Sequence, residues 1–147
     1  MQPEQNFWRF ALYVSFFPQL VAGPIERAKR LLPQFYQDYK IDLEKVKYGF
    51  CLMLWGFFKK MVIADRLGEY VGVVYSQPEQ YEFLQVWLAN GFFILQIYCD
   101  FSGYSDIAIG MAAMMGYKLM LNFRQPLFAQ DVQEFWSRWH LSLTTWF

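Results

Sequence analysis

Long apolar runs alternate with short polar segments along the chain. The apolar runs occupy residues 7–23, 43–58, 67–75, 83–98 and 107–120. Continuous apolar runs bounded by charged or turn-forming residues are typical of buried or membrane-spanning helices. We therefore expect an all-α fold, and more specifically that of a multipass helical membrane protein.

The first apolar run is interrupted by proline and glycine. As a helix, residues 7–23 would span about 25 Å, slightly less than the roughly 30 Å hydrocarbon core of a bilayer. Pro18 lacks the N–H group that a helix interior needs, and Gly23 and Pro24 follow it. This pattern predicts a re-entrant or broken segment.

The most polar stretch, residues 24–47, contains six Lys or Arg residues. Such an excess of basic residues in a short loop indicates the cytoplasmic side of a membrane. Apolar residues recur beside these charges at helical spacing: Leu31, Leu32, Phe35, Tyr36 and Tyr39. The spacing predicts an interfacial helix in the headgroup plane, with a solvated helical loop as the alternative. Asp42 is placed to cap the helix that follows.

Three cations, Lys59, Lys60 and Arg66, interrupt the next apolar region. They must snorkel to the headgroups, face protein, or mark where the helix leaves the bilayer. The loop at residues 76–82 has no Lys or Arg, and we place it on the outside.

A polar octet, residues 99–106 (Cys-Asp-Phe-Ser-Gly-Tyr-Ser-Asp), separates two apolar runs. One straight helix over residues 83–117 would be about 52 Å long, well beyond a bilayer. We therefore expect a bend, and Gly103 is the natural place for it. Beyond the bend, small residues at four-residue spacing predict a stripe where another helix packs closely: Ala108, Ala112 and Gly116.

A second polar cluster lies at residues 133–140 (Gln-Glu-Phe-Trp-Ser-Arg-Trp-His). A turn is expected at residues 122–126, and Asp131 would cap a last helix in a capping box with Glu134. Glu134 and Arg138 are four residues apart, so they share a helical face.

The composition strengthens the membrane prediction. Hydrophobic residues make up 56% of the 147 residues, more apolar surface than a globule of this size can bury, although charged connections hold the mean hydropathy to +0.11. Basic and acidic residues balance at 13 each without a basic stripe, so nucleic acid is not an expected partner. One His and two Cys are too few for a zinc site, and no phosphate-binding glycine loop or nucleophile elbow is present. We expect no metal and no bound cofactor.

Polar side chains in apolar surroundings need partners or water. In the octet, Asp100 and Tyr104 are four residues apart, so a helix places them on one face. Ser102 and Asp106 have the same spacing. Structural pairing and a substrate path remain alternatives for these four residues. The same two alternatives, a structural role or a place on the substrate path, apply to three further polar residues: Arg124, Glu134 and Arg138.

His140 is the one histidine and the candidate catalytic residue. It would share a helical face with Trp136 and Leu143, while Glu134 and Arg138 point elsewhere. A histidine among aromatic residues can be purely structural. It is also the side chain whose pKa suits proton transfer near neutral pH, and both interpretations stay open.

Three blocks of sequence carry a resemblance to a known family. They are Phe-Phe-Pro-Gln-Leu-Val-Ala-Gly-Pro-Ile-Glu-Arg at 16–27, Tyr-Cys-Asp-Phe-Ser-Gly-Tyr-Ser-Asp-Ile-Ala-Ile-Gly at 98–110, and Asn-Phe-Arg-Gln-Pro at 122–126 with Phe-Trp-Ser-Arg-Trp-His-Leu-Ser-Leu-Thr-Thr-Trp at 135–146. The sequence resembles the membrane-bound O-acyltransferase family, most closely the branch with the alginate O-acetylation membrane protein and the teichoic-acid D-alanine transfer protein.

The resemblance implies a multipass enzyme of the bacterial cytoplasmic (inner) membrane. Such an enzyme moves an acyl group, usually acetyl, from a cytoplasmic thioester donor, acetyl-CoA or an acyl carrier protein. The acceptor is an exported polysaccharide or an extracytoplasmic acyl-transfer partner protein, and the lipid bilayer is a further partner. The competing hypothesis is a non-enzymatic membrane scaffold or export module whose polar clusters are structural.

By the same resemblance, His140 corresponds to the first of the family's two characteristic histidines. The second, in a Trp-His-Gly setting usually taken as catalytic, has no counterpart in residues 1–147. We therefore expect these residues to form a single partial domain that lacks upstream spans and the downstream Trp-His-Gly region. Such a fragment is expected to be inactive alone.

Overall fold

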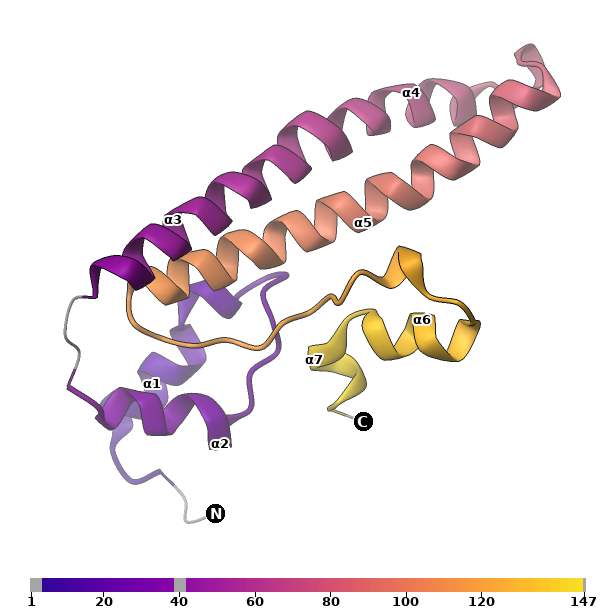
Figure 1. The fold of residues 1–147 in the computed structure, drawn as a ribbon. Helices are drawn as coiled ribbons and strands as arrows, with labels where there is room; N and C mark the ends of the chain where they lie inside the picture. Colours follow the sequence, from indigo (N-terminus) through magenta and orange to yellow (C-terminus); the bar gives the residue numbers. More distant parts are fainter. Residues whose placement is uncertain (1–3, 39–41, 147) are drawn as a thin grey trace.

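The chain folds into helices. The computed structural model describes residues 4–38 and 42–146, and every regular element in those two ranges is helical, which confirms the predicted all-α fold. Figure 1 shows a long hairpin formed by α3 (Leu43–Phe57), α4 (Asp65–Ser76) and α5 (Phe83–Met114). The remaining segments lie along one side of this hairpin.

The first arm of the hairpin is one continuous rod. A π-helical turn, η3 (Phe58–Ala64), joins α3 to α4, and the short turn η4 (Pro78–Gln80) leads into the second arm. The Asp42 side chain accepts hydrogen bonds from the backbone N–H groups of Glu44 and Lys45. The predicted cap of this helix is therefore confirmed.

Two pairs of glycines hold the arms close together. A Cβ atom added at Gly49 would lie 2.4 Å from the carbonyl oxygen of Gly110. One added at Gly56 would lie 2.6 Å from the carbonyl oxygen of Gly103. Both distances are far below van der Waals contact, so only glycine allows the two backbones to approach this closely.

The second arm, α5, has no break at Gly103. It runs without interruption from Phe83 to Met114, so the predicted bend is wrong. That prediction rested on helix length alone, whereas Gly103 serves the close approach of α3. The polar octet is consequently a stretch of regular helix.

The end of α5 is set by Gly116. Ala108 and Ala112 are buried, as a packing stripe requires, but Gly116 lies beyond the helix with a φ of 86°, a conformation that glycine adopts easily. The N–H of Tyr117 donates to the carbonyl of Ala112, and the N–H of Gly116 donates to that of Ala113. These two bonds form a Schellman motif, which ends the helix.

The segment before the hairpin is broken, as predicted. α1 (Phe7–Ser15) ends before Pro18, which lies in the 3₁₀ turn η1 (Phe17–Gln19). Two further short helices follow, α2 (Ala28–Leu31) and η2 (Leu32–Tyr36).

The predicted apolar face of this segment packs against the protein. Leu31 is fully buried in a core cluster with Phe16, Ile109, Ala112 and Leu119. Leu32 is also buried, and Phe35 packs against the same cluster. The helical character of the segment is thus confirmed, and Leu31, Leu32 and Phe35 are buried or pack against the core cluster. Tyr36 is instead exposed, and Tyr39 lies outside the described residues.

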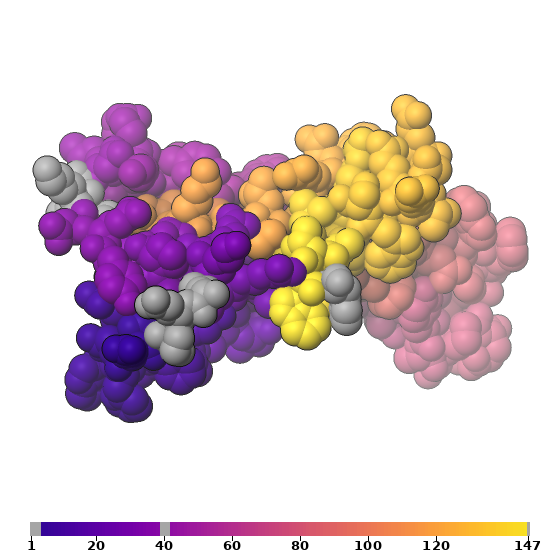
Figure 2. Space-filling model, turned by 90° about the horizontal axis from the view of Figure 1, so that it is seen from below, coloured from indigo at the N-terminus to yellow at the C-terminus, as the bar shows by residue number. Residues whose placement is uncertain are grey.

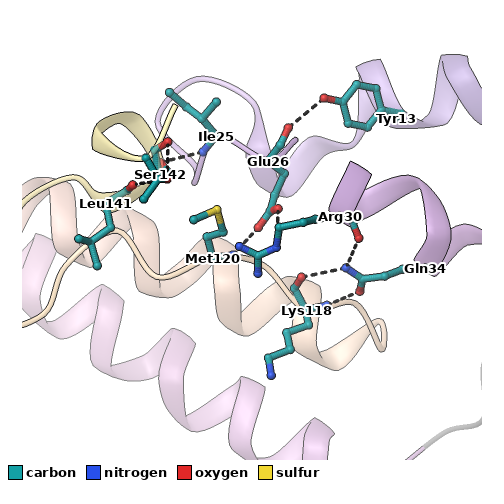
Figure 3. A network of polar contacts seen from close by, with 10 residues as sticks. Tyr13, Ile25, Glu26, Arg30, Gln34, Lys118, Met120, Leu141 and Ser142 are labelled. Carbon is teal, nitrogen blue, oxygen red and sulfur yellow. Dashed lines mark hydrogen bonds and ion pairs between the residues drawn. The ribbon is translucent and has the colours of Figure 1, made fainter. Parts of the chain in front are cut away.

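A buried carboxylate, Glu26, ties this segment to the extended chain after α5. Its Oε1 accepts a hydrogen bond from the N–H of Met120, and its Oε2 lies 3.9 Å from Arg30 Nε (Figure 3). Burial raises the pKa of Glu26, although the Met120 bond and the Arg30 charge oppose that rise. Gln34 adds a second link, because it exchanges hydrogen bonds of 2.8 and 3.0 Å with the backbone of Lys118.

The C-terminal segment contains η5 (Pro126–Phe128), α6 (Val132–Arg138) and α7 (Leu141–Thr144). On the face drawn in Figure 2, this segment, in yellow, lies beside the N-terminal segment, in indigo and violet. The N–H of Ile25 joins them by donating a 3.0 Å hydrogen bond to Ser142 Oγ.

Both arms of the hairpin expose large apolar side chains, among them Leu54, Trp55, Phe58, Trp87 and Ile94. Extensive exposed apolar area marks an interaction surface. Within the described residues, no helix combines the length and the apolar composition that a membrane crossing requires. The multipass part of the predicted fold is therefore not confirmed.

Replacing Gly56 with alanine in the full-length protein is expected to lower the free energy of unfolding by about 1–3 kcal/mol, the usual cost of overpacking. The new methyl group would collide with the carbonyl of Gly103. Gly72→Ala is the matched control, because nothing lies within 4 Å of a Cβ there and alanine favours the helix. Thermal unfolding in detergent measures both, and a Gly56→Ala protein as stable as wild type would contradict the close approach.

Candidate functional site

A cavity of about 640 Å³ lies between the hairpin arms and the extended segment after α5. We call it the hairpin cavity. Its size falls within the roughly 300–1,000 Å³ typical of small-molecule sites. Its polar lining consists of Lys59, Ser102, Ser105, Asp106, Asn122, Arg124 and Gln125, together with the hydroxyl-bearing ring of Tyr98. Its apolar lining includes Trp55, Ile63, Ile109, Phe123 and Phe128.

A buried lysine is central to the polar lining. Lys59 Nζ lies 2.8 Å from Asp106 Oδ2 and donates a 2.9 Å hydrogen bond to Ser102 Oγ. The Lys59 side chain is 9% exposed and the Asp106 side chain 21%. Because a buried charge is costly without a partner, the ammonium group depends on this carboxylate.

The next residue, Lys60, pairs with Asp100. Asp100 and Tyr104 line a second cavity, of about 370 Å³. The Tyr104 hydroxyl donates a 3.0 Å hydrogen bond to the carbonyl of Leu20, which ties α5 to the N-terminal segment.

The polar octet therefore presents two faces. Ser102 and Asp106 belong to the hairpin cavity. Asp100 and Tyr104 belong to the second cavity. Residues four apart share a face, as predicted, but each bonds to another element rather than to its neighbour on the helix.

His140 is not part of a continuous helix. α6 ends at Arg138, and His140 has a left-handed backbone with a φ of 48° immediately before α7. The predicted helical face shared with Trp136 and Leu143 is therefore wrong. The imidazole packs edge-on against the Phe101 ring, with centroids 4.7 Å apart, and it does not line the hairpin cavity. Burial lowers the pKa of His140, which favours the neutral imidazole.

The α6 contacts follow the sequence prediction in most respects. The Asp131 side chain accepts a 2.7 Å bond from the N–H of Glu134, which confirms the cap. Glu134 Oε2 accepts from the N–H of Gln130, one residue earlier than a capping box would have it. Glu134 and Arg138 form the expected ion pair. The carbonyl of Arg138 accepts a 2.9 Å bond from the N–H of Arg124, so α6 is joined to the extended segment.

Sequence reasoning did not identify four residues of the site: Lys59, Ser105, Asn122 and Ser142. Asn122 Nδ2 donates to Ser105 Oγ at 2.9 Å, and Ser142 Oγ donates to Asn122 Oδ1 at 2.5 Å. A signal existed for Lys59, because a cation inside an apolar run needs an anion and the octet supplies two. Nothing in the local sequence distinguishes the other three.

The groups of the site suit proton transfer and hydrogen bonding. A neutral imidazole can accept a proton near neutral pH, and the carboxylate, amide and hydroxyl groups of the cavity can orient a polar ligand. Among the residues that the structure describes, no three His, Cys, Asp or Glu side chains come together as a metal site.

Residues 4–147 match the model of the membrane-bound O-acyltransferase family. The chain belongs to this family. Within it, the chain is 42% identical over 144 residues to a probable alginate O-acetylase of Pseudomonas putida, covering 97% of the chain and 29% of that relative. It is 38% identical over 141 residues to a peptidoglycan O-acetyltransferase of Helicobacter pylori, covering 95% of the chain and 27% of that relative.

The chain is also similar to a relative with another named activity. The chain is 31% identical over 161 residues to a teichoic acid D-alanyltransferase of Streptococcus thermophilus, covering 98% of the chain and 36% of that relative. The chain thus spans between about a quarter and about a third of the length of these relatives. The resemblance identified from the three sequence blocks is confirmed at the level of the family.

Replacing Lys59 with Met in the full-length protein is expected to lower the free energy of unfolding by roughly 3 kcal/mol. This value is the lower end of the range for breaking a buried ion pair, because the Asp106 side chain is partly exposed. The double variant Lys59→Met/Asp106→Asn is expected to recover part of that loss, since no unpaired carboxylate remains. Arg66→Gln is the matched control: it breaks an exposed pair with Glu69, so a change below about 1 kcal/mol is expected. Thermal unfolding in detergent distinguishes these outcomes, and equal effects of Lys59→Met and Arg66→Gln would contradict the buried pair.

Proposed function

We propose that this chain is part of a membrane O-acyltransferase. The acyl group is acetyl, the donor is a cytoplasmic thioester of coenzyme A or an acyl carrier protein, and the acceptor is a hydroxyl group of an exported polysaccharide or an extracytoplasmic partner protein. The enzyme is placed in the bacterial cytoplasmic membrane. The observation that carries the proposal is the family match over residues 4–147, supported by relatives named as a peptidoglycan O-acetyltransferase and a probable alginate O-acetylase.

In the proposed reaction, His140 acts as a general base, a role that the family resemblance usually gives to the second histidine. Its neutral imidazole removes the proton of the acceptor hydroxyl as the oxygen attacks the thioester carbonyl carbon. The new C–O bond forms, the C–S bond breaks, and the imidazolium returns the proton to the departing thiolate. The lowered pKa of His140 supports this role, because the base must be unprotonated when the substrate arrives.

We place the polar substrate in the hairpin cavity, whose lining does not include His140, so the reacting hydroxyl extends beyond this lining to reach the imidazole. Asp106 and Ser102 lie on its wall in fixed positions, because Lys59 contacts both. Arg124 lines the same cavity. The cavity therefore offers hydrogen-bonding partners in fixed positions to a polar ligand.

The second candidate function is a non-enzymatic scaffold or export module. It is favoured by one observation, namely that most polar groups of the octet bond to other elements of the fold. On this hypothesis, Asp100, Asp106 and His140 would tolerate substitution for acyl transfer but not for assembly of the protein.

Replacing His140 with Ala in the full-length protein is expected to lower kcat by about 100-fold or more, because general-base catalysis contributes about 10²–10⁴-fold. Acyl transfer from a radiolabelled acetyl thioester measures the rate per mole of folded protein. Ser137→Ala is the control, since Ser137 is exposed and its hydroxyl contacts only the carbonyl of Glu134. Unchanged turnover in the His140→Ala protein would remove His140 from the reaction.

The rate is expected to fall on the acid side of neutrality. Protonation removes the lone pair with which His140 accepts a proton, and burial lowers its pKa below the usual value of about 6.5. The fall in kcat/KM, which reports the pKa of the free enzyme, should therefore be centred below pH 6.5. Measuring kcat/KM against pH, with thermal stability followed over the same range, checks this; a fall centred above pH 7 would exclude His140 as the titrating base.

A further inference from the structure

We propose that Asn122 is a positioning residue for His140, fixing the backbone that carries the imidazole against α5. The inference rests on the proposed function, because it takes His140 as the base. The Asn122 side chain touches neither the imidazole nor the reacting atoms. It belongs to a buried chain of hydrogen bonds that joins Ser142, Asn122 and Ser105.

The backbone of His140 needs external support. A left-handed conformation in a residue other than glycine is unfavourable by about 1–2 kcal/mol, so it persists only where neighbouring contacts hold it. Two backbone hydrogen bonds flank the histidine, and both lead to the same extended segment. The N–H of Arg124 donates to the carbonyl of Arg138 at 2.9 Å, and the N–H of Leu141 donates to the carbonyl of Asn122 at 2.8 Å.

The side chain of Asn122 completes this support. Its Oδ1 accepts the hydroxyl of Ser142 at 2.5 Å, and its Nδ2 donates to Ser105 Oγ of α5 at 2.9 Å. Ser142 Oγ also accepts the N–H of Ile25, and Figure 3 shows Ile25 and Leu141 on either side of this serine. The residues Ser105, Asn122 and Ser142 are each only 1% exposed. Hydrogen bonds this deeply buried fix the relative positions of the segments they join.

The helix α5 connects this network to the imidazole itself. Ser105, which holds Asn122, is one helical turn from Phe101, whose ring contacts His140. Asn122 also lines the hairpin cavity. The Asn122 amide therefore lies between the hairpin cavity and the segment that carries His140. It fixes the position of that segment relative to the cavity wall.

The test compares three variants of the full-length protein: Asn122→Ala, Ser142→Ala and the double variant. Both single variants are expected to lower kcat, Asn122→Ala by up to about 100-fold, because small misplacements of a catalytic group cost this much. KM should stay within about twofold, because Nδ2 and Oδ1 of Asn122 are already bonded to Ser105 and Ser142 and the Ser142 hydroxyl is bonded to Asn122, so neither side chain is free to bind substrate. The double variant should lose little more than Asn122→Ala alone, because both changes remove the same Ser142–Asn122 bond.

Gln34→Ala is the matched control. Its amide also makes two hydrogen bonds to the segment after α5, at Lys118, but it lies away from His140. The control should keep kcat within about twofold. Rates are expressed per mole of monodisperse protein, so that loss of folded material is not mistaken for loss of turnover.

Three results would overturn the positioning role while leaving the proposed function intact: an unchanged kcat per folded molecule, a raised KM with kcat unchanged, or an equal loss of kcat in Gln34→Ala. If His140→Ala keeps full turnover, the proposed function fails and the positioning role fails with it. If Asn122→Ala does not fold, Ser142→Ala decides the question, because it leaves the bond between Asn122 and Ser105 in place.

Discussion

The close approach of α3 and α5 is the constraint on which the rest of the structure depends. Gly49 meets Gly110, and Gly56 meets Gly103, so each helix carries its two glycines seven residues apart. Two contacts at matching spacing fix the register of the antiparallel pair, because sliding one helix would bring a side chain against a backbone carbonyl. The same register places Lys59, shortly after Gly56, beside the octet that surrounds Gly103.

That register also determines how the charges are paired. Lys59 and Lys60 are adjacent, yet they contact different faces of α5, at Asp106 and Asp100 respectively. The π-helical turn that contains both lysines alters the usual spacing of side chains around the helix at this point, a local distortion often found at functional sites. Burial of the Lys59 pair is costly, and hydrophobic replacements of such pairs are often no less stable. Its position on a cavity wall is thus better explained by a role there than by stability.

The sequence was sufficient to predict features that depend on near neighbours. Asp42 and Asp131 cap their helices, Glu134 pairs with Arg138, and the chain breaks before Pro18, all from contacts within a few residues. Features that depend on distant segments were not predictable in this way. Gly103 was expected to bend a helix, because its partner Gly56 becomes its neighbour only when the hairpin forms.

The site shows the same limit. The octet and His140 were recognisable as polar residues in apolar sequence, but the partners of Asp106 and Ser102 come from η3. The backbone of His140 is left-handed although nothing adjacent to it demands glycine, and the groups that support it belong to residues around position 122. A helical face drawn through residues 136, 140 and 143 could not represent this arrangement, because the helix ends in between.

The blocks of sequence that carry the family resemblance meet in one chain of hydrogen bonds. Ile25 of the first block donates to Ser142, Ser142 donates to Asn122, and Asn122 donates to Ser105 of the polar octet. Residues separated by more than a hundred positions are thereby joined through three bonds. Each block needs the others, since a buried hydroxyl or amide without its partner is costly. Such a network requires polar residues in blocks that are far apart in the sequence. The blocks supply the hydrogen-bonding partners, and the apolar runs between them form the helices that bring these partners together.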